Sequence, residues 1–146
     1  MRLYLLALVA EALFHEIIMD KLTRILKALS DKNRLRIMTA LMAHDELCAC
    51  QLTELLGITG ATVSRHLGVL SNADLVQSRK DGRWVYYRHG KGVEFAAPVL
   101  EWIKNNTLDS VDLQSDLELL KNITACDPEE LCRKQRGAAC CPKKEA

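Results

Sequence analysis

Two cysteines that lie two residues apart, Cys48 and Cys50, are the side chains in this sequence whose spacing points most directly to chemistry. Thiolates are soft ligands that select arsenite, antimonite, cadmium or lead over magnesium or calcium. Residues two apart on an α-helix point nearly opposite ways, at about 100° per residue, so both sulfurs can hold one ion only where a helix start is unwound. We therefore expect ion binding to distort a helix start and to be coupled to what that helix does. The alternative is that both side chains pack as small apolar groups.

A trigonal arsenic site needs a third sulfur, but the next helical turn offers Thr53 in place of a cysteine. The third ligand must come from elsewhere, unless the site works with two. The candidates all lie towards the C-terminus: Cys126, Cys132, Cys140 and Cys141. The last two follow small residues, so this tail could fold onto the Cys48–Cys50 segment of its own chain or of a partner subunit. Alternatively, the tail cysteines form a second site.

The length and composition indicate one small domain with a core of its own. The chain has 146 residues, of which 49% are hydrophobic and 27% charged, and its formal net charge is +1. Between residues 20 and 90 there are 11 Lys and Arg against 7 Asp and Glu, whereas beyond residue 90 there are 8 against 10. The basic middle is where we expect contacts with a polyanion. Because the core needs no disulfide staple, the six cysteines are interpreted as ligands or redox thiols in a reducing cytoplasm.

The N-terminal stretch 1–18 is apolar at its start, but it does not fit a signal peptide or a membrane span. Its apolar run is short, and Glu11 and Glu16 interrupt the residues after that run. We interpret it as an extra helix at a dimer interface, or as residues upstream of a true start at Met19. Export and a membrane partner are not expected.

Helices must position the cysteine pair. Before it, Asp20 can cap a helix over about 21–29, and Asp31 can cap a second one that carries apolar residues at helical spacing up to about residue 42.

The cysteine pair opens a helix-turn-helix pattern. A helix over about 50–56 ends at Gly57, whose freedom at positive φ suits a helix end, and Thr59 can cap the next helix over about 61–73. Two helices joined by a short turn with glycine are typical of DNA-binding helix-turn-helix proteins.

After Asp74 the apolar pattern changes from helical to alternating. Strands are predicted over 75–80 and 83–88 around the Asp81-Gly82 turn, which is a strong hairpin signal. Further helices are expected over about 93–104 and 110–123, followed by at most a short helix from Asp127 and a loose tail from Arg133 to Ala146. The fold class is mainly α with a small β-hairpin, a winged helix-turn-helix. Its expected parts are the N-terminal stretch (1–18), the DNA-binding and dimerisation domain (19–107) and a C-terminal helix with a cysteine-containing tail (108–146).

The start of the second helix of this pattern is the part that we expect in the major groove of double-stranded DNA. The candidate contacts are Thr62, Ser64, Arg65 and His66 on the helix and Arg79, Lys80 and Arg83 on the hairpin. His66 fits a second interpretation equally well, as a half-buried side chain that supports the helix. The alternative for the whole surface is a solvated helix in a winged helix that binds protein.

Over about residues 19–105 the chain resembles the ArsR/SmtB family of metal-sensing repressors, in its arsenic-responsive branch. The matching segments are Ala28-Leu29-Ser30-Asp31, Arg34-Leu35-Arg36-Ile37, Glu46-Leu47-Cys48-Ala49-Cys50-Gln51-Leu52, Thr62-Val63-Ser64-Arg65-His66-Leu67 and Gly82-Arg83-Trp84-Val85-Tyr86-Tyr87. The resemblance implies a homodimer whose outer helices form the interface, repression of a resistance operon, and release from DNA when Cys48 and Cys50 bind the inducer.

The chain also departs from the family pattern. Thr53 stands where a third cysteine is frequent, and Gly60 and Ala61 stand where a polar residue often precedes the recognition helix, which shifts base readout towards Ser64 and Arg65. Zinc and nickel sensors of the family carry histidine ligands after the wing, whereas no histidine follows His89 here.

These features predict a cytoplasmic repressor that binds operator DNA as a dimer and is released by arsenite or antimonite, with no organic cofactor. A cadmium or lead sensor and a redox sensor that forms a disulfide are the alternatives with the same fold. An enzyme such as an arsenate reductase or a thiol oxidoreductase is not supported, because there is no phosphate-cradling loop around a cysteine and no Cys-x-x-Cys on a βαβ unit. A metallochaperone for arsenite would explain the cysteines, but not the wing or the recognition helix.

Overall fold

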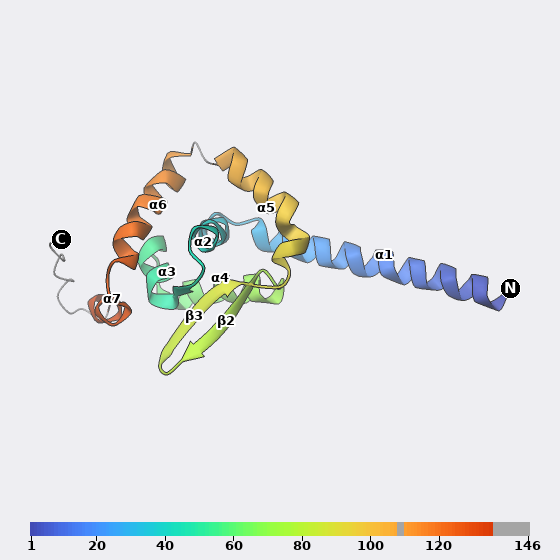
Figure 1. Ribbon diagram of the computed structural model, residues 1–146, viewed down its shortest axis with the longest axis horizontal. Coiled ribbons are helices and arrows are strands. Elements are labelled where there is room, and N and C mark those ends of the chain that lie inside the picture. Colours follow the sequence, from blue (N-terminus) through green and yellow to red (C-terminus); the bar gives the residue numbers. More distant parts are fainter. Residues whose placement is uncertain (108–109, 136–146) are drawn as a thin grey trace.

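The computed structural model describes residues 1–107 and 110–135 and shows a group of helices with a small β-hairpin that projects from one side (Figure 1). The elements are α1 (Arg2–Leu29), α2 (Lys32–Ala43), β1 (Leu47–Cys48), α3 (Ala49–Leu56), α4 (Gly60–Asn72), β2 (Val76–Asp81), β3 (Trp84–His89), α5 (Val93–Thr107), α6 (Val111–Thr124) and α7 (Pro128–Gln135).

The predicted caps set the boundaries of the central helices. The Asp31 carboxylate accepts a hydrogen bond from the Arg34 backbone N–H (3.0 Å) at the start of α2, and the Thr59 hydroxyl accepts one from Thr62 (3.3 Å) at the start of α4. Gly57 ends α3 at φ 65°, a left-handed conformation that glycine adopts without steric cost. The predicted helix-turn-helix, α3 and α4, is therefore confirmed.

The first helix is longer than predicted. A start at Asp20 was wrong, because α1 is one helix of 28 residues from Arg2 to Leu29. The stretch before Asp20 is rich in leucine, alanine and glutamate and contains neither glycine nor proline, so nothing in it stops a helix. Only the C-terminal part of α1 joins the core, while the rest projects away from the other elements (Figure 1). Within 1–107 and 110–135, no helix is long and apolar enough to cross a membrane.

The sheet has three antiparallel strands in the order β1-β3-β2. The predicted hairpin is confirmed, with each strand beginning one residue later than expected. The third strand, β1, was not predicted, because two residues carry no alternating pattern. It places Leu47 opposite Tyr87 and Cys48 opposite Tyr86, so the cysteine segment is part of the wing sheet.

One core joins the helix-turn-helix to the C-terminal helices. Its largest fully buried side chains include Ile37, Met38 and Leu41 of α2, Leu52 of α3, Leu67 and Leu70 of α4, and Leu120 of α6. Leu131 of α7 belongs to the same cluster. The expectation of a loose tail from Arg133 was wrong for 133–135, which continue α7, because burial of Leu131 fixes this helix on the body. The remainder of that tail lies outside the described residues.

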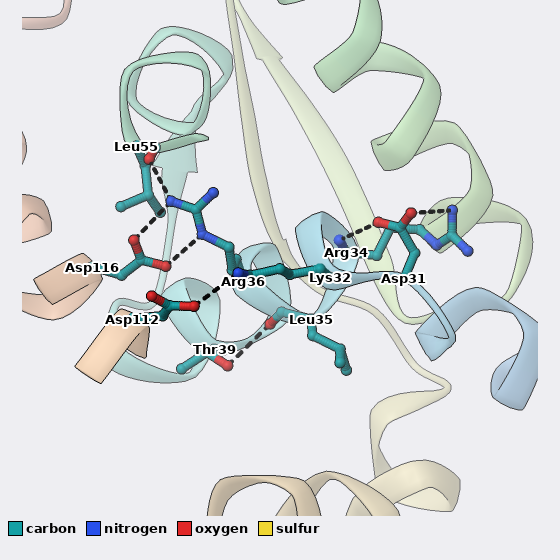
Figure 2. A network of polar contacts seen from close by, with 9 residues as sticks. All are labelled: Asp31, Lys32, Arg34, Leu35, Arg36, Thr39, Leu55, Asp112 and Asp116. Carbon is teal, nitrogen blue, oxygen red and sulfur yellow. Dashed lines mark hydrogen bonds and ion pairs between the residues drawn. The ribbon is translucent and has the colours of Figure 1, made fainter. Parts of the chain in front are cut away.

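A polar network ties α6 to α2 and to the end of α3 (Figure 2). The Arg36 guanidinium forms a two-pronged contact with Asp116 (2.6 and 2.7 Å) and donates to the Leu55 carbonyl (2.9 Å), while Lys32 pairs with Asp112 (2.8 Å). Arg36 and Asp116 are mostly buried, and the hydrogen bonds that Arg36 donates to the Asp116 carboxylate raise the pKa of Arg36. Charge-assisted forks of this kind are geometrically specific, so this one fixes where α6, and α7 after it, lie against α3.

Candidate thiol sensor and nucleic-acid interface

Cys48 lies just before α3, whose start at Ala49 is close to the predicted start at about residue 50. It is extended (φ −79°, ψ 159°), ends β1 and precedes α3, while its backbone N–H donates to the Gln51 side chain (2.8 Å). Cys50 is helical and Cys48 is not, so the two cysteines stand on either side of the helix start, and the binding of one ion by both thiols stays a prediction. Cys48 is fully buried. Burial raises the pKa of its thiol, and backbone N–H groups of Gln51 and Cys50 offset this only in part.

Cys50, in the first turn of α3, faces Cys132 of α7, and a disulfide joins them. Their Cα atoms are 5.8 Å apart, across a sequence separation of 82 residues. Cys50 is buried and Cys132 is half-buried. Of the four cysteines considered as third ligands, the structure thus brings Cys132 to the Cys48–Cys50 segment, although the composition had indicated no need for a disulfide. Reduction would leave two facing thiols on neighbouring helices.

The other candidate ligands do not join this pair. Cys126 is a free, half-buried thiol, while Cys140 and Cys141 lie outside the described residues. Within 1–107 and 110–135 no group of three or more histidine, cysteine or acidic side chains is gathered as a metal site would require. The donor set present is therefore a facing dithiol with a third thiol, Cys48, two residues away in the chain. It fits a thiophilic ion that two sulfurs can capture.

Helix α7 also holds the first helix of the helix-turn-helix through polar contacts. The Gln135 side chain donates to the Cys50 carbonyl (2.9 Å), and Lys134 pairs with Glu54 of α3 (2.7 Å). At its other end, Glu129 pairs with Arg83 of the wing. This short helix therefore bridges the thiol pair, α3 and one of the wing cations that were predicted to contact DNA.

The recognition helix α4 carries four of the residues that were predicted to contact DNA. Ser64 and Arg65 are exposed, and Thr62 is half-buried. His66 is turned inward: its side chain is 15% exposed, and its Nδ1 lies 3.6 Å from a carboxylate oxygen of Asp31, the cap of α2. Of the two interpretations of His66, this placement favours a side chain that supports the helix.

The wing carries the other predicted DNA contacts, and two of these three cations are engaged by carboxylates. Arg79 makes a two-pronged contact with Glu46 (3.0 and 2.8 Å) and a further one with Asp81 (3.1 Å), and these carboxylates raise the pKa of Arg79. Arg83 pairs with Glu129 and lies over the ring of Trp84. Lys80 is exposed, and no ion pair holds it within the described ranges.

A cross-strand row links the thiol segment to the wing. In the sheet register Cys48, Tyr86 and Arg79 stand opposite one another on β1, β3 and β2, and the Arg79 guanidinium lies 4.9 Å from the centre of the Tyr86 ring. Residues directly opposite on neighbouring strands share a face of the sheet. Movement of the Cys48 segment would therefore shift Arg79 in two ways: through this row, and through Glu46, which pairs with Arg79 and lies two residues before Cys48.

Three acidic or amide side chains at this site were missed by sequence reasoning: Glu46, Glu129 and Gln135. Glu46 stood in a matching motif, but nothing in its spacing linked it to a wing arginine 33 positions later. Glu129 and Gln135 belong to a segment whose helix was expected to be minimal or absent. Long-range ion pairs of this kind leave no periodic signal in a sequence.

The fold and the surface together define a winged helix-turn-helix protein. Residues 31–78 match the family described as bacterial regulatory protein, arsR family. An uncharacterised helix-turn-helix transcriptional regulator from Methanocaldococcus jannaschii is 35% identical over 68 residues, which cover 47% of this chain and 76% of that protein. The chain belongs to the ArsR family. The family and fold are those of DNA-binding transcriptional regulators rather than of enzymes.

Two relatives carry names that refer to resistance. The cadmium resistance transcriptional regulatory protein CadC of Listeria innocua is 48% identical over 61 residues, which are 42% of this chain and 51% of that protein. The arsenic resistance transcriptional regulator ArsR1 of Pseudomonas putida is 39% identical over 64 residues, 44% of this chain and 50% of that protein. The chain thus spans about half the length of these curated relatives.

Among solved structures, the chain is similar to the homodimeric winged helix-turn-helix DNA-binding domain of a possible ArsR-family regulator from Mycobacterium bovis. The TM-score is 0.55 with 26% identity, covering 66% of this chain and 86% of that one.

Proposed function

We propose that this protein is a homodimeric repressor that binds operator DNA through α4 and the wing and releases it when its thiols capture arsenite or antimonite. The observation that carries the proposal is Cys132 of α7 facing Cys50 of α3, the first helix of the helix-turn-helix. A chemical event at this pair acts directly on the elements that position α4. The family and the basic middle of the chain support DNA as the partner.

The facing dithiol suits trivalent arsenic. Arsenous acid, As(OH)₃, condenses with the reduced thiols of Cys50 and Cys132 to form two As–S bonds, with release of two water molecules and retention of one hydroxyl on arsenic. No electrons are transferred in this step. Cys48 is the nearest third thiol in the chain, and replacement of the last hydroxyl by its sulfur would release a third water. Because burial raises the pKa of the Cys48 thiol, this thiol stays protonated and its proton leaves with the hydroxyl as that third water.

Release of DNA follows from what α7 and β1 contact. An ion held between Cys50 and Cys132 keeps α7 docked on α3, which keeps Glu129 on Arg83. Engagement of Cys48 pulls on β1, which is paired with the wing strand β3. Both effects disfavour the wing geometry and charge that DNA requires, so ion and DNA affinities are reciprocally coupled. The conformation described, with Cys50 joined to Cys132, corresponds to the released form.

Two alternatives keep the same site. Cadmium or lead would need donors beyond the facing pair, and the name of the Listeria relative supports cadmium as a candidate. An oxidant is favoured by the disulfide itself: a peroxide would convert the two thiols to the disulfide and be reduced to water and its alcohol, or to two waters from hydrogen peroxide.

The test is DNA release by the reduced dimer. An operator is selected from a random duplex library, labelled, and followed by fluorescence anisotropy while arsenite, antimonite, cadmium, lead or hydrogen peroxide is titrated. We expect arsenite and antimonite to release DNA at the lowest concentrations. Cys50→Ser and Cys132→Ser should bind DNA normally and lose this response by at least about 10-fold in inducer concentration, whereas Cys126→Ser, a matched control at a free half-buried thiol, should respond like the wild type.

Each other result has a meaning. Release by peroxide alone would replace the metalloid with the oxidant, and a full response by Cys132→Ser would move the sulfur that pairs with Cys50 from Cys132 to Cys140 or Cys141. A protein that binds arsenite but selects no duplex would be a metallochaperone and not a repressor.

A further inference from the structure

The N-terminal part of α1 carries a long exposed apolar surface that the proposed function does not use. Between Leu3 and Met19 the large apolar side chains other than Ile18 are half or more exposed; at the ends of this range Leu3 is 86% and Met19 59% exposed. Soluble proteins rarely leave contiguous apolar patches of this extent uncovered. In Figure 1 this segment projects beyond the other elements, so none of the helices and strands that the structure describes covers it.

The apolar side chains include a stripe with the spacing of a helix–helix seam. Leu3, Leu6, Ala10, Leu13 and Ile17 follow one another at intervals of three, four, three and four residues. A narrow apolar stripe with this alternation is the a/d pattern by which two helices pack side by side. A parallel stripe through Leu8, Ala12 and Met19 is interrupted by His15, whereas the first stripe has no polar residue between Leu3 and Ile17.

The stripe ends where α1 reaches the body. Its next two positions are the exposed Asp20 and Arg24. From there a different face of the helix becomes the apolar one: Ile18 and Leu22 are half-buried, and Ile25 and Leu29 are buried in the core. Helix α1 thus packs one face against its own body, while another face, further out, has no partner among the described residues of its own chain.

We propose that the stripe from Leu3 to Ile17 packs against the same stripe of a second copy of this chain, as a short coiled coil that extends the dimer interface. A two-fold dimer presents the same surface from both subunits, and a heptad seam is complementary to itself. Two heptads are too few for a helix pair that is stable alone, so a neighbouring contact must tether them. Lys21, one turn beyond Ile17, lies 4.7 Å from the ring of Phe95 on α5, and Phe95 and Trp102 of α5 are themselves exposed. The seam therefore runs into a second apolar face that the same partner copy can cover.

The inference presupposes the proposed homodimer, and its test is the dimer dissociation constant of the full chain, measured by sedimentation velocity and light scattering. The variant Leu6→Lys/Leu13→Lys places charges in the seam, where the side chains are 68% and 54% exposed. The control Leu5→Lys/Leu8→Lys adds the same charge outside it, at 65% and 50% exposure. We expect the seam variant to raise the dissociation constant on the order of 100-fold and the control to change it less than about threefold. Neither pair touches the core, and helix content from circular dichroism reports whether α1 persists.

A gain-of-function variant makes the test two-sided. Ala10→Leu fills the small central position of the seam and should lower the dissociation constant several-fold. Equal weakening by both lysine pairs, or no effect of Ala10→Leu, would overturn the seam. A wild-type protein that is monomeric in solution and binds phosphatidylglycerol vesicles, with vesicle binding lost in both lysine variants, would make this surface a lipid anchor. That result would also overturn the proposed seam. We expect the seam variant to bind DNA normally, and to release it normally on addition of arsenite, at concentrations where the variant is dimeric. Failure of the seam proposal would therefore leave the repressor proposal unaffected.

Discussion

The two surfaces predicted to contact DNA differ in whether their cations are held in ion pairs within the described residues. On α4, Ser64 and Arg65 are exposed, and no ion pair holds Arg65 within the described residues. On the wing, Arg79 is held by Glu46 and Asp81, and Arg83 is held by Glu129.

The carboxylates that hold the wing come from the sensor side of the molecule. Glu46 immediately precedes β1, and Glu129 lies on the helix that carries Cys132. Beneath the exposed face of α4, in contrast, Val63, Leu67 and Leu70 are buried, so the core fixes that helix in one position. The recognition helix is therefore the constant part of the DNA-binding surface, and the wing is the part whose charge can be changed. Substitutions on α4, at the Arg36 clamp and on the wing test that division.

Loss of the central cation of α4 should have the largest effect. We expect Arg65→Ala to weaken operator binding by roughly 10- to 100-fold in both the reduced and the arsenite-bound states, because a base or phosphate contact on a fixed helix does not depend on the sensor. Fluorescence anisotropy at several salt concentrations measures the loss and shows whether Arg65 contacts phosphate, which lowers the salt slope. Arg24→Ala, an exposed arginine of α1, is the control. A loss confined to one sensor state would contradict a constant α4.

Breaking the clamp shown in Figure 2 should separate the sensor from the recognition helix. Asp116→Asn removes the charge that pairs with the mostly buried Arg36, at a cost of about 2 kcal/mol in the free energy of unfolding. Because α6 positions α7, the variant should also need more arsenite to release DNA, while the affinity of the reduced protein for DNA changes little. Urea unfolding and the anisotropy titration measure the two effects. Glu118→Gln on the exposed side of α6 is the matched control, and an unchanged arsenite response in Asp116→Asn would show that α6 does not position the sensor.

The helix-turn-helix could be predicted from the sequence, whereas the geometry around the cysteines could not. The helix-turn-helix was predictable because its signals are local: the caps Asp31 and Thr59, the stop at Gly57 and the Asp81-Gly82 turn each act within a few residues. Cys48 and Cys50 were identifiable as a pair, but their geometry was not, because β1 exists only through pairing with a strand almost 40 residues later.

The sensor's third element needed long-range information. Cys132 was one of four candidates, and only the packing of α6 and α7 on α3 selects it among the described cysteines. For α1, a local signal was misleading. Asp20 is a good capping residue, but it does not start a helix when the residues before it are equally good helix formers.

The smallest effect, and the most specific to the wing, should come from freeing its cations. Glu129→Gln removes the partner of Arg83, and Glu46→Gln removes the strongest partner of Arg79. Exposed ion pairs are worth about 0.2–1 kcal/mol, so we expect DNA affinity to rise by no more than about fivefold at low salt. For Glu129→Gln the rise should be greater in the arsenite-bound or disulfide-linked protein than in the reduced protein, because α7 is docked in the former. Fluorescence anisotropy in both states measures this difference in DNA affinity. Glu118→Gln, which removes one negative charge elsewhere, is the control for a simple change in net charge. An equal rise in the two states would mean that α7 shields the wing permanently, and that the thiols act through β1 alone.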